Sequence, residues 1–396
     1  MGLMLLQSDI SSPDAASVSA SEALKALRSW VERRDFAGWD PYDALNSPVL
    51  NALFGHDKWS RIACIQTMKR LPVNLRGVLG AHPGHNPKAL ALFLEGYVKL
   101  AARGLDEQCK SHVLRLIELL ATTRTATSAG HGWGYNFDWQ SRAFFVPRGT
   151  PSIVCSAFVG HALLDAYEFL GEPRALQLAV PISHFILRDL NRIPAGDTFC
   201  FSYTPIDHYG VHNANVLGAS LLIRIGAITN DAACRDAAHC AFDYSMRHQR
   251  EDGSWFYSEK TGARWVDSFH TGFVLESIRR FICLGEAQQY RAAYERGRGF
   301  YAERFFLSDG TPKYYDQQTY PIDTHSPAEA ISFFSAEPGY SEVAGRVLRW
   351  TLANMLDPSG CFYFRRTRYL TNKIPYMRWS QAWMFRALTN YSMAIR

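Results

Sequence analysis

Three segments of the chain place an aspartate shortly before a histidine, and these pairs are well suited to acid/base chemistry. They are Asp207 with His212, Asp267 with His270, and Asp323 with His325, and the aspartates stand 60 and 56 residues apart. Helix capping alone explains each carboxylate, because it accepts hydrogen bonds from exposed N–H groups where a helix begins. Capping does not explain the histidines, whose imidazoles exchange protons near neutral pH. We interpret all six residues as candidate catalytic residues.

Two kinds of acid/base chemistry fit this set. Glycosidic cleavage needs two carboxylates, one protonated and one ionised, and it is the preferred prediction. Epimerisation or elimination beside a carboxylate needs a base and an acid on opposite faces of the sugar ring. Imidazoles and tyrosine hydroxyls suit that task, and the chain offers His212, His270, His325, Tyr203, Tyr257 and Tyr315. A non-catalytic glycan-binding protein is the third alternative. The spacing of the three aspartates in the folded chain separates catalysis from capping.

Side chains suited to holding a sugar are spread along the sequence. Aromatic faces pack on the apolar faces of sugar rings, and an arginine pairs with a uronate or phosphate through two hydrogen bonds. The candidates for substrate binding are Trp133, Tyr135, Asp138, Trp139, Arg142, Trp255, Tyr257, Tyr315 and Arg378. For any one of them the alternative is structural, since aromatics also pack cores and arginines also bridge loops.

Metal and cofactor chemistry find less support. His208 and His212 are four residues apart, which would bring them to one face of a helix and make a metal site a minor alternative. We predict no metal and no cofactor. The sequence has no Walker A, GxGxxG or GxSxG pattern and no acidic motif of a terpene cyclase, which disfavours nucleotide, dinucleotide, serine-hydrolase and isoprenoid chemistry.

Pairs of helices are expected to position these residues. From residue 86 onward, a helix that is apolar on nearly all faces is repeatedly followed by an amphipathic one. The first helices begin near residues 87, 152, 212, 268, 326 and 377, and their partners span 106–121, 173–190, 231–247, 287–305 and 341–355. The helix at 377–393 has no successor, so a helix at 21–33, capped by Ser19 or Ser21, is expected to pair with it. The pattern predicts an inner barrel of first helices within a ring of second helices.

An aromatic turn recurs between successive pairs. With Gly132, Thr198, Gly253, Gly310 and Gly360 as landmarks, the spacings are 66, 55, 57 and 50 residues, which is typical of repeated supersecondary units. Asp-Gly favours a tight turn, and the alternating aromatics after it suit a short hairpin. We therefore expect hairpin-like turns at one mouth of the barrel, with the Asp/His pairs facing that mouth.

The turn Gln249-x-x-Asp252-Gly253-x-Trp255 resembles the turns of α/α-toroid proteins, among them triterpene cyclases and sugar-processing toroids. Longer segments at 38–43, 132–142, 267–273 and 378–383 are similar to bacterial proteins found with surface-polysaccharide biosynthesis genes. The resemblance implies an all-α (α/α)6 toroid and a carbohydrate context. It implies nothing finer. Our own prediction is a saccharide or lipid-linked saccharide as substrate, with other polysaccharide-biosynthesis proteins as partners.

Composition bounds the remaining alternatives. A net charge of +5, from 42 basic and 37 acidic residues, makes no case for nucleic acid or a membrane surface as partner. The eight cysteines form no CxxC, which favours a reducing compartment. The first residues lack the pattern of a signal peptide, and no integral membrane segment is predicted. We expect a cytoplasmic protein, with residues 1–18 as a mobile tail and 19–396 as one domain.

Overall fold

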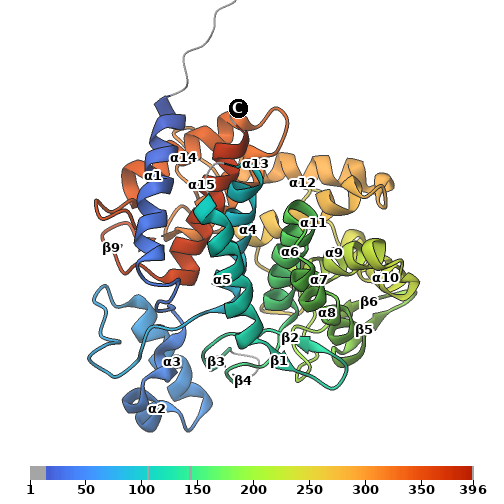
Figure 1. Cartoon of the computed structure of the whole chain (residues 1–396), viewed down its shortest axis with the longest axis horizontal. Helices are drawn as coiled ribbons and strands as arrows, with labels where there is room; N and C mark the ends of the chain where they lie inside the picture. The colour runs from blue at the N-terminus through green and yellow to red at the C-terminus, as the bar shows by residue number, and fades with distance from the viewer. Residues whose placement is uncertain (1–14, 105–106, 142–144, 395–396) are drawn as a thin grey trace, which may run out of the picture.

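The computed structural model describes residues 15–104, 107–141 and 145–394. Within them, six helices form a closed inner ring in which each helix packs on the next and the last returns to the first. These helices are α4 (Pro87–Ala102), α6 (Ile153–Leu170), α9 (His212–Thr229), α11 (Ser268–Cys283), α13 (His325–Ser335) and α15 (Trp383–Ala394). Their faces are apolar almost all round because they are covered on all sides. Figure 1 shows the ring surrounded by further helices.

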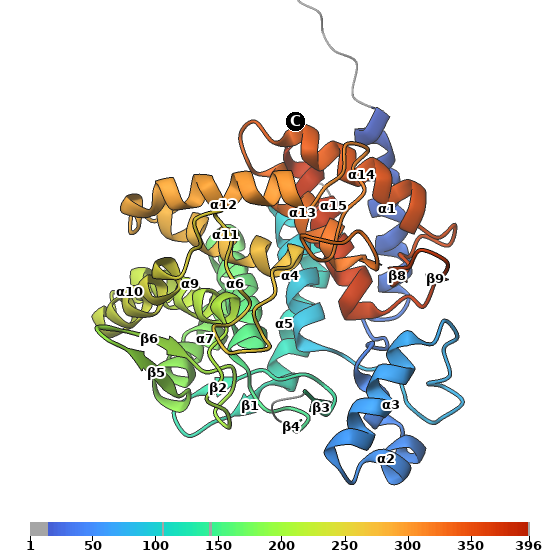
Figure 2. The ribbon, with the colours of Figure 1, turned by 180° about the vertical axis from the view of Figure 1, so that it is seen from behind.

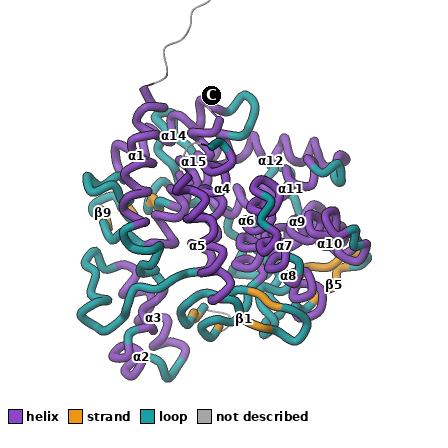
Figure 3. The backbone as a smooth tube through the Cα atoms, in the orientation of Figure 1, coloured by secondary structure: helices purple, strands orange, loops and turns teal. Residues whose placement is uncertain are grey.

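The outer ring consists of one helix packed behind each inner helix. In the same order these are α5 (Glu107–Thr123), α7 (Pro173–Ala179), α10 (Ala232–Arg247), α12 (Arg291–Arg304), α14 (Ser341–Met355) and α1 (Ala15–Glu32). Helix α1 lies against α15 and α14, so the two ends of the chain meet and close the ring, as predicted. Figure 3 shows that strands are few and short beside the helices.

Some predicted helix bounds are wrong, each for a local reason. The helix expected over 173–190 ends at Ala179, and α8 (Pro181–His184) and a π-turn η2 (Phe185–Asp189) follow, because Pro181 has no N–H to donate. Helix α9 continues past the expected stop at Gly226 and ends before Asn230, which adopts a left-handed conformation with φ 55°. Helix α1 begins at Ala15, so part of the predicted tail is helical, and residues 1–14 lie outside the described residues.

The recurrent turns have two different constructions. Gly253, Gly310 and Gly360 share a positive φ of 90°, 87° and 91°, and each donates its N–H to the carbonyl three residues earlier at 2.9 Å. Each of these turns packs on the outer helix that follows it along the ring, α12, α14 or α1. The other two landmarks, Gly132 and Thr198, lie in strands. The regular spacing of the five landmarks therefore follows from the repeated helical pairs of the ring. Of the five, three share one turn geometry.

Short antiparallel strand pairs follow several outer helices. They are β1 (Thr125–Ala126) with β2 (His131–Gly132), β3 (Trp139–Gln140) with β4 (Phe145–Val146), β5 (Arg192–Ala195) with β6 (Thr198–Phe201), and β7 (Ile322–Asp323) with β8 (Arg365–Arg366) and β9 (Thr371–Asn372). A one-turn helix η3 (Gln288–Tyr290) precedes α12, and a π-helical stretch η4 (Met377–Ala382) runs into α15.

Residues 38–84 form a small unit beside the ring, at the lower left of Figure 1. It contains η1 (Asp43–Asn46), α2 (Pro48–Phe54) and α3 (Lys58–Arg70), which enclose a separate apolar cluster around Leu45 and Ile65. Within the unit, Arg76 Nε forms a buried ion pair with Asp43 Oδ1 at 2.5 Å. The same guanidinium donates a hydrogen bond to the hydroxyl of Tyr376 at 2.8 Å, which attaches the unit to the last part of the chain. This attachment brings Tyr42 to the mouth of the ring.

Helix α6 is long and apolar enough to span a membrane, but it is an inner helix of the ring and 72% of it is buried. Its hydropathy therefore reflects its place in the protein core. None of the eight cysteines forms a disulfide bond.

Candidate functional site

A cavity of about 200 Å³ lies at the mouth of the ring where the inner helices begin. The first turns of five inner helices and the segment before the sixth each contribute a lining residue: Lys88, Val154, Asn213, His270, His325 and Arg378. Aromatic side chains form most of the remaining wall. Since all inner helices point the same way, a residue placed at any helix start is brought to this cavity when its side chain turns inward.

Asp267 and His270 form a hydrogen-bonded dyad in the cavity wall. Asp267 is the N-cap of α11, where its Oδ1 accepts the backbone N–H of His270 at 3.0 Å. Its Oδ2 lies 2.7 Å from Nδ1 of the same histidine and also accepts the indole N–H of Trp265 at 3.1 Å. Because the carboxylate holds the proton on Nδ1, Nε2 is left with a free lone pair. The arrangement is that of an oriented general base.

His325 is buried beside the dyad, and neither of its ring nitrogens has a hydrogen-bond partner among the described residues. Its imidazole stacks on Phe269 at 4.2 Å between centroids and lies 4.2 Å from the ring centre of Trp383. The His270 ring also lies 4.2 Å from the Phe269 centroid, so one phenyl ring contacts both imidazoles. Burial, and then the nearby Lys88 and Arg378 cations, lower the pKa of His325 well below its ordinary value. The imidazole is therefore neutral, with one donor and one acceptor.

Lys88 is a buried cation at the inner end of the cavity. Only 3% of the residue is exposed, and its Nζ lies over the rings of Phe158, Phe273 and Trp383 at 4.3, 5.0 and 5.1 Å. No described carboxylate forms an ion pair with it. Burial lowers the pKa of Lys88 to about 7, and repulsion from Arg378 adds to that effect. An amine with this pKa exchanges protons readily at neutral pH.

Two groups of aromatic side chains line the walls. Tyr257 stacks on Trp265 at 4.5 Å and touches His270 with its ring centre 4.9 Å away. Across the cavity wall, Tyr135 and Tyr203 interact through their hydroxyls, and burial raises the pKa of Tyr135 to about 12. Tyr203 also contacts Trp139. Flat apolar faces edged with hydroxyl groups suit the two faces of a sugar ring.

Arg378 reaches the cavity from the π-helical stretch before α15, but its charge is already compensated. Its Nε and Nη2 bind Asp40 at 2.5 and 2.8 Å, and both residues are buried. The guanidinium also lies over the ring of Tyr135 at 4.9 Å. Because two hydrogen bonds fix it against a carboxylate, Arg378 holds the unit at residues 38–84 in place. Asn213 is the other notable polar group, since its buried Oδ1 has no partner among the described residues.

No protein-family model and no curated protein matches the chain, whereas many solved structures share its fold. An α-mannanase of family GH76 from Bacteroides thetaiotaomicron is 12% identical with a TM-score of 0.62, over 78% of this chain and 86% of that one. Cellobiose 2-epimerase from Bacillus thermoamylovorans is 11% identical with a TM-score of 0.61, over 79% and 90%. The fold is an (α/α)6 toroid.

An unsaturated glucuronyl hydrolase from Streptococcus agalactiae matches the toroid over 98% of both chains, with a TM-score of 0.58 and 12% identity. Its coverage extends the fold assignment over nearly the whole chain. The toroid predicted from the helical pairs is thus confirmed. The identities are too low to transfer an activity, so the chemistry has to be argued from the cavity.

The toroid brings together nine of the residues singled out from the sequence. They are Tyr135, Trp139, Tyr203, Tyr257, Asp267, His270, Tyr315, His325 and Arg378, all in the cavity wall. We expected all three Asp/His pairs to face one mouth. This holds for Asp267 and His270 and, in the third pair, for His325.

Asp207 and Asp323 do not line the cavity, because backbone and side-chain donors elsewhere occupy their carboxylates. Asp207 accepts the N–H groups of Thr204 and Tyr209 at 2.7 and 2.8 Å, which closes a loop before α9. The Asp323 carboxylate accepts hydrogen bonds from Nη2 of Arg365 at 2.8 Å and from the backbone N–H of His325 at 3.2 Å. It also accepts one from the indole N–H of Trp379. Both carboxylates hold backbone segments, as the capping alternative requires.

His212 turns away from the cavity, toward the outer ring. Its Nε2 lies 3.0 Å from Glu259 and its Nδ1 3.3 Å from Ser245, and burial lowers its pKa. Helix α9 begins at His212, so His208 precedes the helix and the one-face argument for a metal pair is wrong. Among the residues that the structure describes, no group of three His, Cys, Asp or Glu is arranged to hold a metal ion.

Three predicted binding residues serve the framework of the toroid. Trp133 is fully buried and donates its indole N–H to Leu120. Trp255 donates to the carbonyl of Ser245 from beneath the cavity wall. Asp138 accepts the N–H of Arg148 at 2.7 Å within a loop. Arg142 lies outside the described residues.

Lys88 is the functional candidate that the sequence reasoning missed. It follows Asn86-Pro87, which is a clear helix start, and a cation is disfavoured there by the positive end of the helix dipole. A lysine in the first turn of an otherwise apolar helix was therefore the available signal. The other aromatic side chains in the wall were not singled out from the sequence, and they are Tyr42, Phe137, Trp265, Phe269, Phe273, Tyr314 and Trp379.

Proposed function

We propose that this toroid is an enzyme that moves a proton at the carbon next to the carbonyl group of a sugar, as an epimerase or isomerase does. The observation that carries the proposal is the pairing of two imidazoles with a single carboxylate in the cavity. Glycosidic cleavage by two carboxylates, the preferred prediction from the sequence, has less support. Asp267 is the one carboxylate among the described lining residues, and it is bound to His270.

His270 is the group that removes the proton. Its Nε2 carries the free lone pair, and the Asp267 carboxylate stabilises the imidazolium that forms. As the C–H bond of the open-chain sugar breaks, its electron pair moves into the bond to the carbonyl carbon, and negative charge develops on the carbonyl oxygen. The intermediate is an enediolate, and stabilising that oxygen is the main demand on the remaining groups.

Lys88 meets this demand from the floor of the cavity. Its protonated amine has no ion-pair partner among the described residues and can bind the developing oxyanion, and a pKa of about 7 also lets it donate a proton there. The neutral His325 then exchanges a proton with the enediol through its unpaired nitrogens. Return of a proton to the same carbon from the other face gives an epimer, and return to the neighbouring carbon gives an aldose–ketose isomer.

The aromatic walls support a saccharide as substrate, and the proteins of similar structure act on saccharides according to their names. The pathway that we propose for this reaction rests on the resemblance of segments 38–43 and 378–383 to proteins of surface-polysaccharide biosynthesis. We accordingly place the reaction in the cytoplasm, on a sugar or lipid-linked precursor used by partner proteins of that pathway. Compositional analysis of surface glycan in a deletion strain tests this setting.

The reaction itself is tested without knowing the natural substrate. The purified protein is incubated with cellobiose, D-mannose, D-glucose and D-glucuronate in D₂O, and deuterium at the carbon beside the carbonyl is followed by NMR. We expect incorporation into at least one sugar, with a loss of about 10²-fold or more in His270→Gln and His325→Gln. His212→Gln is the matched control, because that imidazole lies outside the cavity and its replacement leaves exchange intact.

Two results would overturn the proposal. Release of a sugar from a glycoside without C–H exchange would identify a hydrolase. Saturable binding with neither exchange nor cleavage, for every sugar that binds, would identify a glycan-binding protein.

A further inference from the structure

A second cavity, of about 650 Å³, lies at the opposite mouth of the ring, where the inner helices end. The C-terminal halves of all six inner helices line it, and it shares no lining residue with the first cavity. Six of its lining side chains are basic and two are acidic: Lys99, Arg103, Arg224, Arg279, Arg280 and Arg386, against Glu95 and Asp165. A cavity of this size accommodates a small molecule.

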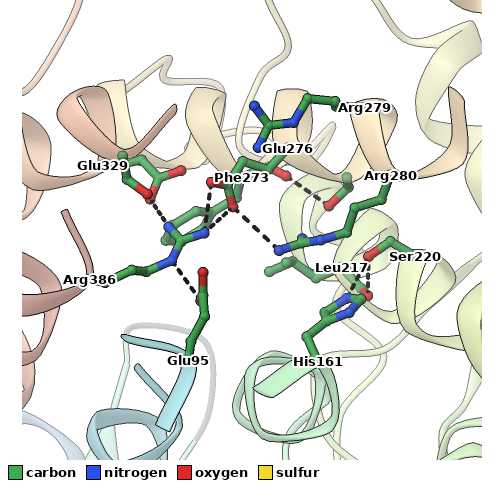
Figure 4. Close-up of polar contacts among 12 residues, drawn as sticks. Glu95, His161, Leu217, Ser220, Phe273, Glu276, Arg279, Arg280, Glu329 and Arg386 are labelled. Atoms are coloured by element: carbon green, nitrogen blue, oxygen red, sulfur yellow. Dashed lines mark hydrogen bonds and ion pairs between the residues drawn. The ribbon is translucent and has the colours of Figure 1, made fainter. Parts of the chain in front are cut away.

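Buried carboxylates already compensate the deepest cation. Arg386 binds Glu95 at 2.8 Å, Glu276 at 2.8 Å through each of its oxygens, and Glu329 at 3.2 Å. Figure 4 shows these carboxylates reaching Arg386 from different helices of the ring. Because a buried ion requires this degree of pairing, Arg386 fixes the helices together and is not free to bind a ligand.

The neighbouring cations are paired as well. Lys99 binds Glu95 at 2.6 Å, Arg224 binds Asp165 at 2.6 Å, and Arg279 binds Glu337 at 2.9 Å. Arg103 donates to a backbone carbonyl at 2.7 Å. Each of these side chains is held in place around the rim of the cavity.

Arg280 is paired less closely than these cations. Its nearest carboxylate, on Glu276, lies 3.7 Å away, and its buried Nη1 has no hydrogen-bond partner among the described residues. Figure 4 shows its side chain extending from α11 toward the centre of the ring, between the Arg386 cluster and His161. Burial lowers its pKa, and Glu276 offsets only part of that effect. A buried guanidinium nitrogen without a hydrogen-bond partner is costly unless an acceptor reaches it.

We propose that the second cavity is a binding site for a phosphate group, with Arg280 as the side chain that binds it. A guanidinium binds two oxygens of one phosphate at once. A phosphate dianion offers three acceptor oxygens and nearly twice the charge of a carboxylate, which suits a cavity where cations arrive from several helices. The ligand is a small phosphorylated compound or free phosphate. This site is independent of the proton-transfer chemistry at the other mouth.

Calorimetry on the full chain tests this site with inorganic phosphate and with glucose 6-phosphate, at constant ionic strength set with sodium chloride. We expect saturable binding of one equivalent, weakened at least about tenfold in Arg280→Gln. Tighter binding of glucose 6-phosphate than of phosphate identifies a phosphorylated compound as the ligand, and equal binding identifies phosphate alone. Arg280→Lys, which keeps the charge but not the planar fork, is expected to bind with intermediate affinity.

Two controls make the result specific. Arg188→Gln removes one exposed charge from the outer ring and is expected to leave phosphate binding unchanged. Lys88→Met, in the first cavity, is also expected to leave it unchanged. Absence of binding to the wild-type protein, equal binding by the Arg280 variants and the wild type, or loss of binding in Lys88→Met would each overturn the assignment.

Discussion

At the scale of single residues, Asp267 combines two tasks that the sequence offered as alternatives. It caps α11 and orients the imidazole of His270 with the same carboxylate. Asparagine caps a helix as well as aspartate does, but it carries no charge to stabilise an imidazolium. The two tasks are therefore separable by one substitution.

We predict that Asp267→Asn lowers the rate of C–H exchange by about 10²-fold while changing the free energy of unfolding by less than about 1 kcal/mol. Exchange measured by NMR and unfolding measured by circular dichroism check both parts. Asp309→Asn is the control, because Asp309 stabilises a recurrent turn remote from the cavity. A large loss of stability in Asp267→Asn with exchange retained would leave capping as the whole role of this residue.

Lys88 provides a prediction about pH. Its pKa falls from 10.5 in a free lysine to about 7 in the fold, so between these two values the unfolded chain binds more protons than the folded one. Stability attributable to this group therefore rises with pH across that interval. We predict that Lys88→Met removes the rise, stabilises the protein at pH 7 by more than about 1 kcal/mol, and abolishes exchange.

Denaturant unfolding at pH 7, 8.5 and 10 measures this effect. Lys25→Met, at an exposed position on α1, controls for the general loss of one positive charge. A Lys88→Met protein that is less stable than the wild type at pH 7 would contradict the assignment of Lys88 as an uncompensated buried cation.

At the scale of elements, the recurrent turns join each unit of the ring to the next. Gly310 has a φ of 87°, and a Cβ built on it would lie 2.3 Å from the carbonyl oxygen of Arg346 in α14. Gly285 has a similar φ of 81° but no atom within 4 Å of such a Cβ. Comparing alanine substitutions at Gly285 and Gly310 therefore distinguishes two costs. Both positions bear the backbone strain of a left-handed residue, and only Gly310 adds a steric clash with the outer helix.

We predict that Gly285→Ala costs about 1 kcal/mol from strain alone, whereas Gly310→Ala costs more than about 2 kcal/mol because the turn must also move away from α14. Denaturant midpoints of the two variants and the wild type measure the difference. Equal effects would mean that the turn moves freely and does not fix the spacing between units.

At the scale of the whole molecule, closure of the ring joins the two ends of the chain. Helix α1 supplies the outer partner of α15, and Leu27 of α1 is fully buried in the common core. We predict that Leu27→Ala destabilises the protein by about 2–5 kcal/mol through the cavity it leaves. Thermal unfolding compares it with Leu53→Ala, which changes a side chain 65% exposed on α2 and is expected to cost less than about 0.5 kcal/mol.

The sequence alone determined the architecture of this protein. Apolar faces, caps such as Asn86 and Asp267, and the regular spacing of the aromatic turns are local signals, and each acts through neighbours in the chain. They predicted inner and outer helices, closure by the first helix, and strand pairs between the units. They failed mainly where one proline or one asparagine decided a boundary.

Only the tertiary structure decided which polar residues share a cavity. Each helix start carries several polar side chains, and the rotation of that helix within the ring determines whether a side chain points inward or toward the outer ring. His325 points inward and His212 outward, although both begin an inner helix. Likewise Arg378 is neutralised by Asp40, from the other end of the chain, while no carboxylate in the described part of the chain pairs with Lys88. These pairings join residues distant in sequence, so no local pattern predicts them.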